Sequence, residues 1–160
     1  MKGRPLLVAA AAIAALIASP VSNVARADSP TTSIETEYLG TLRVATEPPQ
    51  MAGARMIYNV TNCTLQGPKI IAACVPPSAN WTTPTLDGFI RLDFRATLKT
   101  DENEFIFMEG GGFITDGHSI ATPRFMTNSK TYGWLNSVQA VAKMVAIGQG
   151  WTNYDVFVVR

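Results

Sequence analysis

The sequence predicts an all-β domain: a single antiparallel barrel of about eight strands, closed as in lipocalin-like calycins and with little helix. Three observations predict it. Residues 88–100 alternate strictly between apolar and polar side chains. Turn signals rich in Gly, Pro, Asp and Asn recur at short spacing along the chain. No stretch between these turns has a clear helical period. A sandwich fits the same pattern, but a barrel leaves no unpaired edge strand and is favoured for that reason.

The alternating stretch has two chemically different faces. Ile90, Leu92, Phe94, Ala96 and Leu98 form one face, and the polar face consists of Arg91, Asp93, Arg95, Thr97 and Lys99. Period two is the pattern of a strand, because successive side chains point to opposite sides. Residues 87–88 and 100–103 are turn signals on either side. A second strand at 104–108 follows at once, so the pair is predicted to form an antiparallel hairpin.

The remaining strands are predicted around this hairpin. Pro48-Pro49 and Pro76-Pro77 are expected to end strands, since proline cannot donate to a ladder. The run Gly110-Gly111-Gly112 predicts a bulge or sharp bend. Loops are expected at 62–68 and 80–84, and Gly148-Gln149-Gly150 predicts the last hairpin turn. Strands are expected at 34–45, 55–60, 69–75, 121–127, 132–147 and 151–159, of which 138–147 also fits a helix.

Residues 1–27 have the parts of a secretory signal peptide. Lys2 and Arg4 precede an apolar run, and Ala25-Arg26-Ala27 resembles a cleavage site. The apolar run is shorter than the ~20 residues that a membrane-spanning helix needs. We therefore expect cleavage after Ala27, a mature chain of residues 28–160 forming one domain, and a periplasmic or secreted location without a membrane anchor.

Composition excludes several partner classes. The leader holds 3 of the 13 basic residues, so the mature chain keeps 10 against 12 acidic residues. Without a basic excess, nucleic acid is not an expected partner. One His and no Cys-x-x-Cys spacing argue against a metal site. The glycine run is not a phosphate loop, and no cofactor is expected. The sequence leaves the oligomeric state open.

Cys63 and Cys74 are the only cysteines. An even pair in an exported chain usually forms a disulfide. Closing so short a loop stabilises the fold by about 3 kcal/mol on the chain-entropy estimate. Two buried free thiols are the alternative.

Several motifs resemble those of a known family. Residues 62–68, Asn-Cys-Thr-Leu-Gln-Gly-Pro, are similar to a Gly-Gly-Thr-Phe-x-Gly-Pro stretch. Residues 78–81 resemble Gly-Ala-Asp-Trp, and 92–101 resemble Leu-Asp-x-Arg-x-Thr-Leu-x-Thr-Asp. Residues 123–125 and 132–136 are similar to the closing motifs. Together these motifs resemble those of DUF3237, also called UPF0311, a family of uncharacterised bacterial proteins.

The resemblance implies a compact β-barrel and no settled activity. Three positions depart from the family pattern: Asn80 replaces an Asp, Cys63 replaces a Gly, and Gly110-Gly111-Gly112 replaces an Asn-Arg-Gly element. A family site that used that Asp or that Arg would be altered in this chain. The leader is a further addition.

The polar face of the alternating strand is the best candidate site. One interpretation is a solvated face whose charges suppress edge pairing. The other places Asp93, Arg95 and Thr97 inside the barrel, where paired charges surround a ligand. Arg124 and Asn136 would add polar contacts, and Trp81 or Trp134 would cover the apolar part of the ligand. Large aromatic residues are also ordinary core residues.

Two functions follow from this site. The first is binding of a small organic molecule, anionic or aromatic, in the barrel. The second is an enzyme of isomerase, cyclase or hydrolase type, with Asp93 as general base and Arg95 stabilising an anion. A fully paired Asp93 and Arg95 would favour binding or a purely structural role. His118 lies beside Ser119, but adjacency does not make a catalytic triad. An outer-membrane barrel is disfavoured, because too few strands alternate over the necessary length.

Overall fold

The computed structural model describes residues 33–160, so the predicted leader lies outside the described residues. Nine strands and one short 3₁₀ helix follow each other along this part of the chain. They are β1 (Thr36–Thr46), β2 (Gln50–Ala52), β3 (Arg55–Gly67), β4 (Ile70–Pro84), β5 (Ile90–Thr100), β6 (Phe105–Thr115), β7 (His118–Met126), η1 (Gly133–Ser137), β8 (Gln139–Gly148) and β9 (Trp151–Val159).

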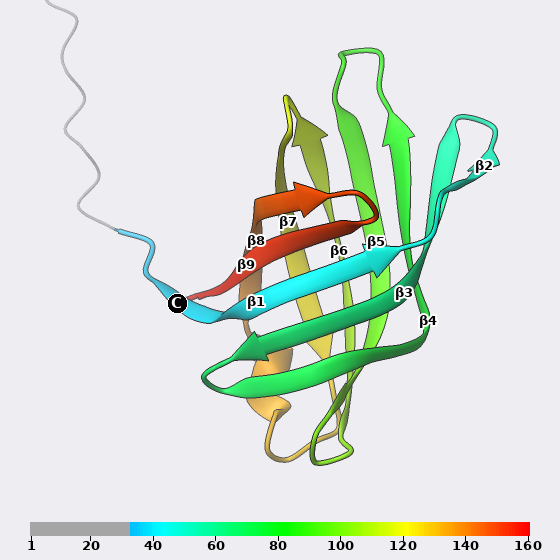
Figure 1. The fold of residues 1–160 in the computed structure, drawn as a ribbon. Coiled ribbons are helices and arrows are strands. Elements are labelled where there is room, and N and C mark those ends of the chain that lie inside the picture. The colour runs from blue at the N-terminus through cyan, green and yellow to red at the C-terminus, as the bar shows by residue number, and fades with distance from the viewer. Residues whose placement is uncertain (1–32) are drawn as a thin grey trace, which may run out of the picture. The chain divides into compact units, whose positions relative to one another are not determined.

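The strands close into an antiparallel barrel, as the sequence predicts (Figure 1). The order is β1-β9-β8-β7-β6-β5-β4-β3-β2, and β1 also pairs with β3. Eight strands therefore complete the wall. The ninth, β2, pairs only with the beginning of β3 and projects beyond the wall with it (Figure 1). This strand occupies a stretch that the prolines at 48 and 49 led us to treat as a break.

The inner face of the wall is the hydrophobic core. On β5, Leu92, Phe94, Ala96 and Leu98 are buried, and the alternate residues point outward. Other strands add inward side chains at every second position, among them Ile106 and Met108 of β6. The predicted two faces of β5 are confirmed. The apolar face lies inside, because burial of apolar area is the main favourable contribution to folding.

The corner between β3 and β4 differs from the prediction. Residues 62–67 and 80–84 are strand rather than loop, and Pro76-Pro77 do not end β4. The β4–β5 ladder instead shifts register between Val75 and Ala79. Ser78 restores hydrogen bonds there: its Oγ accepts from the Thr97 N–H at 3.2 Å and donates to the Val75 carbonyl at 2.9 Å. A bulge thus absorbs the prolines within a continuous strand.

A disulfide joins the same corner. Cys63 of β3 and Cys74 of β4 form the predicted bridge, with Cα atoms 5.0 Å apart. Cys63 is buried in the core. The bridge spans the part of the β3–β4 ladder where the register shifts between Asn59 and Thr64. It therefore links two strands where their backbone pairing is interrupted.

Gly110-Gly111-Gly112 form no bulge, so that part of the prediction is wrong. Each glycine pairs in register with β5 and with β7. A Cβ on Gly110 would lie 2.5 Å from the Thr122 carbonyl oxygen and 2.6 Å from Cζ of Phe94. The glycine is required because the Phe94 ring and the β7 backbone approach this closely.

The segment predicted as a strand over 132–147 is split. Residues 133–137 form η1, and β8 begins at Gln139. The β7–β8 ladder contains two pairs, Ile120 with Lys143 and Ala121 with Ala142. Pro123 has no N–H to donate further along. The Gln139 amide donates to the Pro123 carbonyl at 3.3 Å and bridges the gap between the strands.

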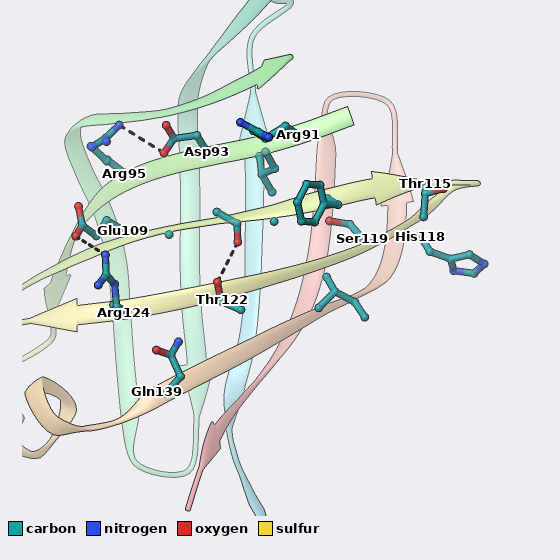
Figure 2. A pocket seen from close by; sticks show the side chains of 16 residues that line it. Arg91, Asp93, Arg95, Glu109, Thr115, His118, Ser119, Thr122, Arg124 and Gln139 are labelled. Atoms are coloured by element: carbon teal, nitrogen blue, oxygen red, sulfur yellow. Dashed lines mark hydrogen bonds and ion pairs between the residues drawn. The ribbon is translucent and has the colours of Figure 1, made fainter. Parts of the chain in front are cut away.

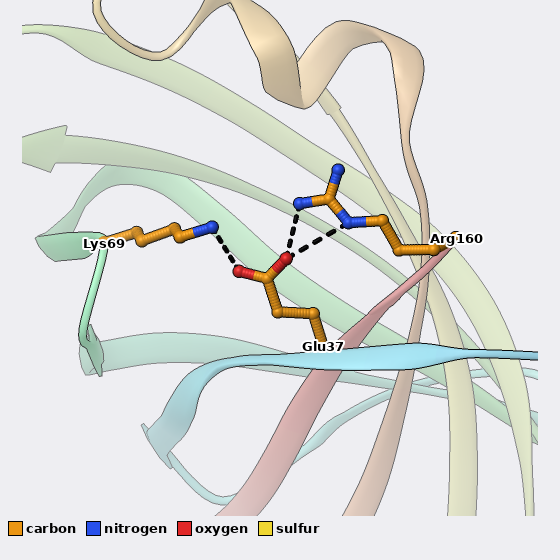
Figure 3. Close-up of polar contacts among 3 residues, drawn as sticks. All are labelled: Glu37, Lys69 and Arg160. Atoms are coloured by element: carbon orange, nitrogen blue, oxygen red, sulfur yellow. Dashed lines mark hydrogen bonds and ion pairs between the residues drawn. The ribbon is translucent and has the colours of Figure 1, made fainter.

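An ion-pair cluster ties together three distant parts of the chain (Figure 3). The Glu37 carboxylate of β1 lies between Lys69 in the β3–β4 turn and the C-terminal residue Arg160. The Arg160 Nε–H donates to Glu37 at 3.1 Å, and its backbone N–H donates to Glu35. The hydrogen bonds from the Lys69 and Arg160 side chains hold the pKa of Glu37 below its usual value.

Candidate functional site

The outer face of β5, β6 and β7 is organised in cross-strand rows. Arg95, Glu109 and Arg124 form one row, because Glu109 pairs with both arginines. In the next row, Gly111 lies between Asp93 and Thr122. In the row after that, Phe113 lies between Arg91 and Ile120. The first row is charged, the second has no side chain at its centre, and the third combines Arg91 with two apolar side chains.

A hollow of about 930 Å³ lies on this face (Figure 2). Gly111 forms its floor, because the two flanking rows rise on either side of a residue without a side chain. The floor is fixed by Thr122, whose hydroxyl donates to the Gly111 carbonyl at 3.3 Å. The side chains around the floor are Arg91, Asp93, Arg95, Glu109, Phe113, Ile120, Thr122, Arg124 and Gln139.

The charges in the hollow are unequally paired. Arg95 lies 3.6 Å from Asp93, and Arg124 lies 3.5 Å from Glu109. Within residues 33–160, Arg91 makes no ion pair. A guanidinium without a carboxylate partner beside Phe113 and Ile120 can bind the anionic group of a molecule whose apolar part rests on those side chains.

The inward placement of Asp93, Arg95 and Thr97 is wrong. All three point out of the barrel, since Leu92, Phe94 and Ala96 occupy the interior. The side chains of Arg95 and Asp93 are 49% and 41% exposed. The interior holds a void of about 40 Å³, whereas ligand pockets usually measure about 300–1,000 Å³. The ligand site predicted inside the barrel therefore has no space there.

The other predicted ligand residues are dispersed. Trp81 pairs with Asp93 across β4 and β5, and the Arg95 guanidinium lies 5.4 Å from its ring centroid. Arg124 lines the hollow with Arg95. Trp134 and Asn136 belong to η1 rather than to this face. Asn136 has a structural role: its side chain accepts from the Thr127 N–H at 2.8 Å and donates to the Thr127 carbonyl at 2.9 Å.

Ser119 and His118 are adjacent in β7 but lie on opposite faces of the strand. Ser119 is buried and accepts a hydrogen bond from the Tyr154 hydroxyl at 3.4 Å. Burial raises the pKa of Tyr154, and the bond to Ser119 partly offsets this. His118 is exposed and points away from Ser119 (Figure 2). Asn80, which replaces an Asp of the family pattern, lines the small internal void.

Two further observations concern residues 33–160. No group of three His, Cys, Asp or Glu side chains among them is placed to hold a metal ion. In that same range, no helix has the length and apolar character needed to cross a membrane.

Several residues of the hollow were not singled out from the sequence. Glu109, Thr122 and Ile120 belong to strands in which glycines and a proline interrupt the alternation. Only the register of β6 against its two neighbours brings them beside Arg91 and Arg95. The polar face of β5 and Arg124 were the sequence signals that pointed to this surface.

The chain belongs to the DUF3237 family, described as proteins of unknown function. Residues 34–122 match the family. This range includes β1 to β6 and the part of β7 that reaches Thr122, and so contains most of the hollow. The suspected family is confirmed. No curated protein matches the chain.

Solved structures share the fold. A β-barrel-like protein from Acinetobacter baumannii is 22% identical, with a TM-score of 0.70 over 82% of this chain and 99% of its own. A conserved protein of unknown function from Rhodopseudomonas palustris is 21% identical, with a TM-score of 0.74 over 82% and 100%. A protein from Penicillium herquei described as an enzyme is 19% identical, with a TM-score of 0.67 over 82% and 98%.

Proposed function

We propose that the protein binds a small organic anion with an apolar body in the outer hollow. The observation that carries this proposal is Arg91, which makes no ion pair within the described residues and lies beside Phe113. A carboxylate would accept two hydrogen bonds from the guanidinium. The apolar body would cover Phe113 and Ile120, which are 51% and 56% exposed.

The binding experiment uses titration calorimetry with benzoate, phenylacetate and octanoate, and with benzamide as a neutral analogue of benzoate. We expect at least one carboxylate to bind saturably and benzamide to bind more weakly. Arg91→Gln should weaken carboxylate binding roughly tenfold or more, because a hydrogen bond to a charged group contributes about 1.5–3 kcal/mol. Arg43→Gln is the matched control, since Arg43 stacks on Trp151 away from the hollow.

Equal affinities of the Arg91→Gln variant and the unmodified protein would contradict the proposal, as would the absence of saturable binding by all three carboxylates. A catalytic role for Asp93 is the second candidate, favoured by the description of one structural neighbour as an enzyme.

We also propose that this function operates outside the cytoplasm. The leader pattern of residues 1–27 and the disulfide between Cys63 and Cys74 both support export, since disulfides persist in oxidising compartments. Mass spectrometry of the natively expressed protein should find Asp28 at the N-terminus. A chain that begins at Met1 would contradict export by cleavage.

A further inference from the structure

The outer face of β5–β7 repeats its chemistry on both sides of Gly110. Gly110 pairs with Phe94 of β5 and with Pro123 of β7, so these three residues define one level across the strands. On both β6 and β7, the residues three positions before and three positions after this level are apolar. On β6 these are Phe107 and Phe113, and on β7 they are Ile120 and Met126.

Four large apolar side chains of these strands are about half exposed. Phe105 is 55%, Phe113 51%, Ile120 56% and Met126 50% exposed. They lie in two groups on this face, Phe113 with Ile120 and Phe105 with Met126, on opposite sides of the charged row of Arg95, Glu109 and Arg124. Exposed apolar groups rimmed by polar residues are typical of interaction sites. Apolar area alone does not identify the binding partner, so the identity of the partner is inferred from the neighbouring charges.

The charges of this face are complementary to those of the same face on a second copy. On β5, Asp93 precedes and Arg95 follows the residue at the Gly110 level. On β6, Glu109 precedes and Gly111 follows Gly110 itself, so Glu109 lies beside Arg95 and Gly111 beside Asp93. Consider a two-fold axis in the plane between two facing copies, running across the strands at this level. Arg95 then faces Asp93 of the second copy, and Glu109 faces the bare Gly111. Phe107 faces Phe113, and Met126 faces Ile120, because both pairs are equidistant from the axis.

We propose that a second copy of this chain packs on this face as an isologous dimer about that axis. Every contact then occurs twice, as two-fold symmetry requires. A two-fold axis along β6 would instead set the row of Arg95, Glu109 and Arg124 against the same row of the second copy. Arg95 would then face Arg124, and Glu109 would face Glu109. The charge pattern therefore selects one of the two face-to-face arrangements. The empty floor at Gly111 provides room for the Glu109 side chain of the second copy.

The decisive experiment is a charge complementation between two variants. R95D places two acidic residues on each copy, and D93R places two basic residues on each copy. Each variant alone should be monomeric, because the two contacts across the axis become repulsive. An equimolar mixture should form heterodimers, since each acidic pair then meets a basic pair. The ion pair within each copy stays broken in the mixture, so recovery must come from contacts between copies.

Light scattering during size-exclusion chromatography of the exported protein should give twice the mass of one chain, over a dilution series. Each single variant should raise the dimer dissociation constant at least roughly tenfold, as like-charge contacts cost several kcal/mol. R43D on β1 is the control and should remain dimeric. Circular dichroism checks that the variants fold. A monomeric unmodified protein, or folded monomeric variants that do not pair in the mixture, would overturn the proposal.

The dimer would cover Arg91 and Phe113, so an organic anion and a second copy compete for one face. This consequence rests on the proposed function, whereas the dimer itself does not. A saturating carboxylate should shift the unmodified protein toward monomer and leave the Arg91→Gln dimer unchanged. Failure of carboxylate binding is detected by calorimetry, and failure of the interface is detected by the complementation experiment, so the two outcomes are separable.

Discussion

The inner and outer faces of β5, β6 and β7 share one backbone but differ in how far their side chains are buried. The inner face packs Leu98 and Ile106, both 0% exposed, against side chains from the other strands. The outer face carries half-exposed charges and a glycine floor above the same strands. The inner face determines whether the chain folds. The outer face contributes less to the buried core and presents its side chains to a ligand or a partner.

The largest difference between the faces is expected from truncation of one large side chain on each. Leu98→Ala should lower the free energy of unfolding by about 2–5 kcal/mol, because it leaves a cavity in packed core. Phe105→Ala on the outer face should change it by about 0.5 kcal/mol or less. Urea denaturation of both variants checks this. Similar losses for the two would show that the outer face is buried in solution.

An intermediate effect is expected from two neighbouring glycines. Gly110→Ala should cost about 1–3 kcal/mol by overpacking, because the new Cβ would clash with the Thr122 carbonyl and the Phe94 ring. Gly111→Ala points into the hollow, where the nearest atom is the Leu92 carbonyl oxygen at 3.2 Å. The Gly111→Ala variant should therefore lose much less stability than Gly110→Ala. Thermal unfolding of both variants is the measurement, and equal losses would contradict the assignment of the two faces.

The smallest effect is expected from the exposed Glu37 cluster. Its lowered pKa means that the cluster contributes its full stabilisation above the unfolded pKa of about 4.3 and loses it as the pH falls through the lower folded value. The melting temperatures of Glu37→Gln and the unmodified protein should differ at neutral pH and converge in acid. Glu35→Gln is the control. A difference that persists in strong acid would contradict a role of the ionised carboxylate.

The sequence by itself determined the fold class and the two faces of β5, and it predicted the disulfide. Alternation over Ile90 to Leu98 is a local property, and one buried face is enough to make it a strand. The two cysteines were predicted to pair because their number and the leader restrict the alternatives. The end of β4 was misjudged at Pro76-Pro77, because local rules do not foresee a bulge that accommodates prolines within a ladder.

Only the tertiary structure decided which face of β5 lies inside. Period two places Asp93 and Arg95 together but leaves their side of the wall open. Closing the barrel put Leu92, Phe94 and Ala96 in the interior, because burying paired charges costs more than burying apolar side chains. The hollow depends on residues of three strands that meet at Gly111. Such a site is set by register between distant segments, which no local pattern records.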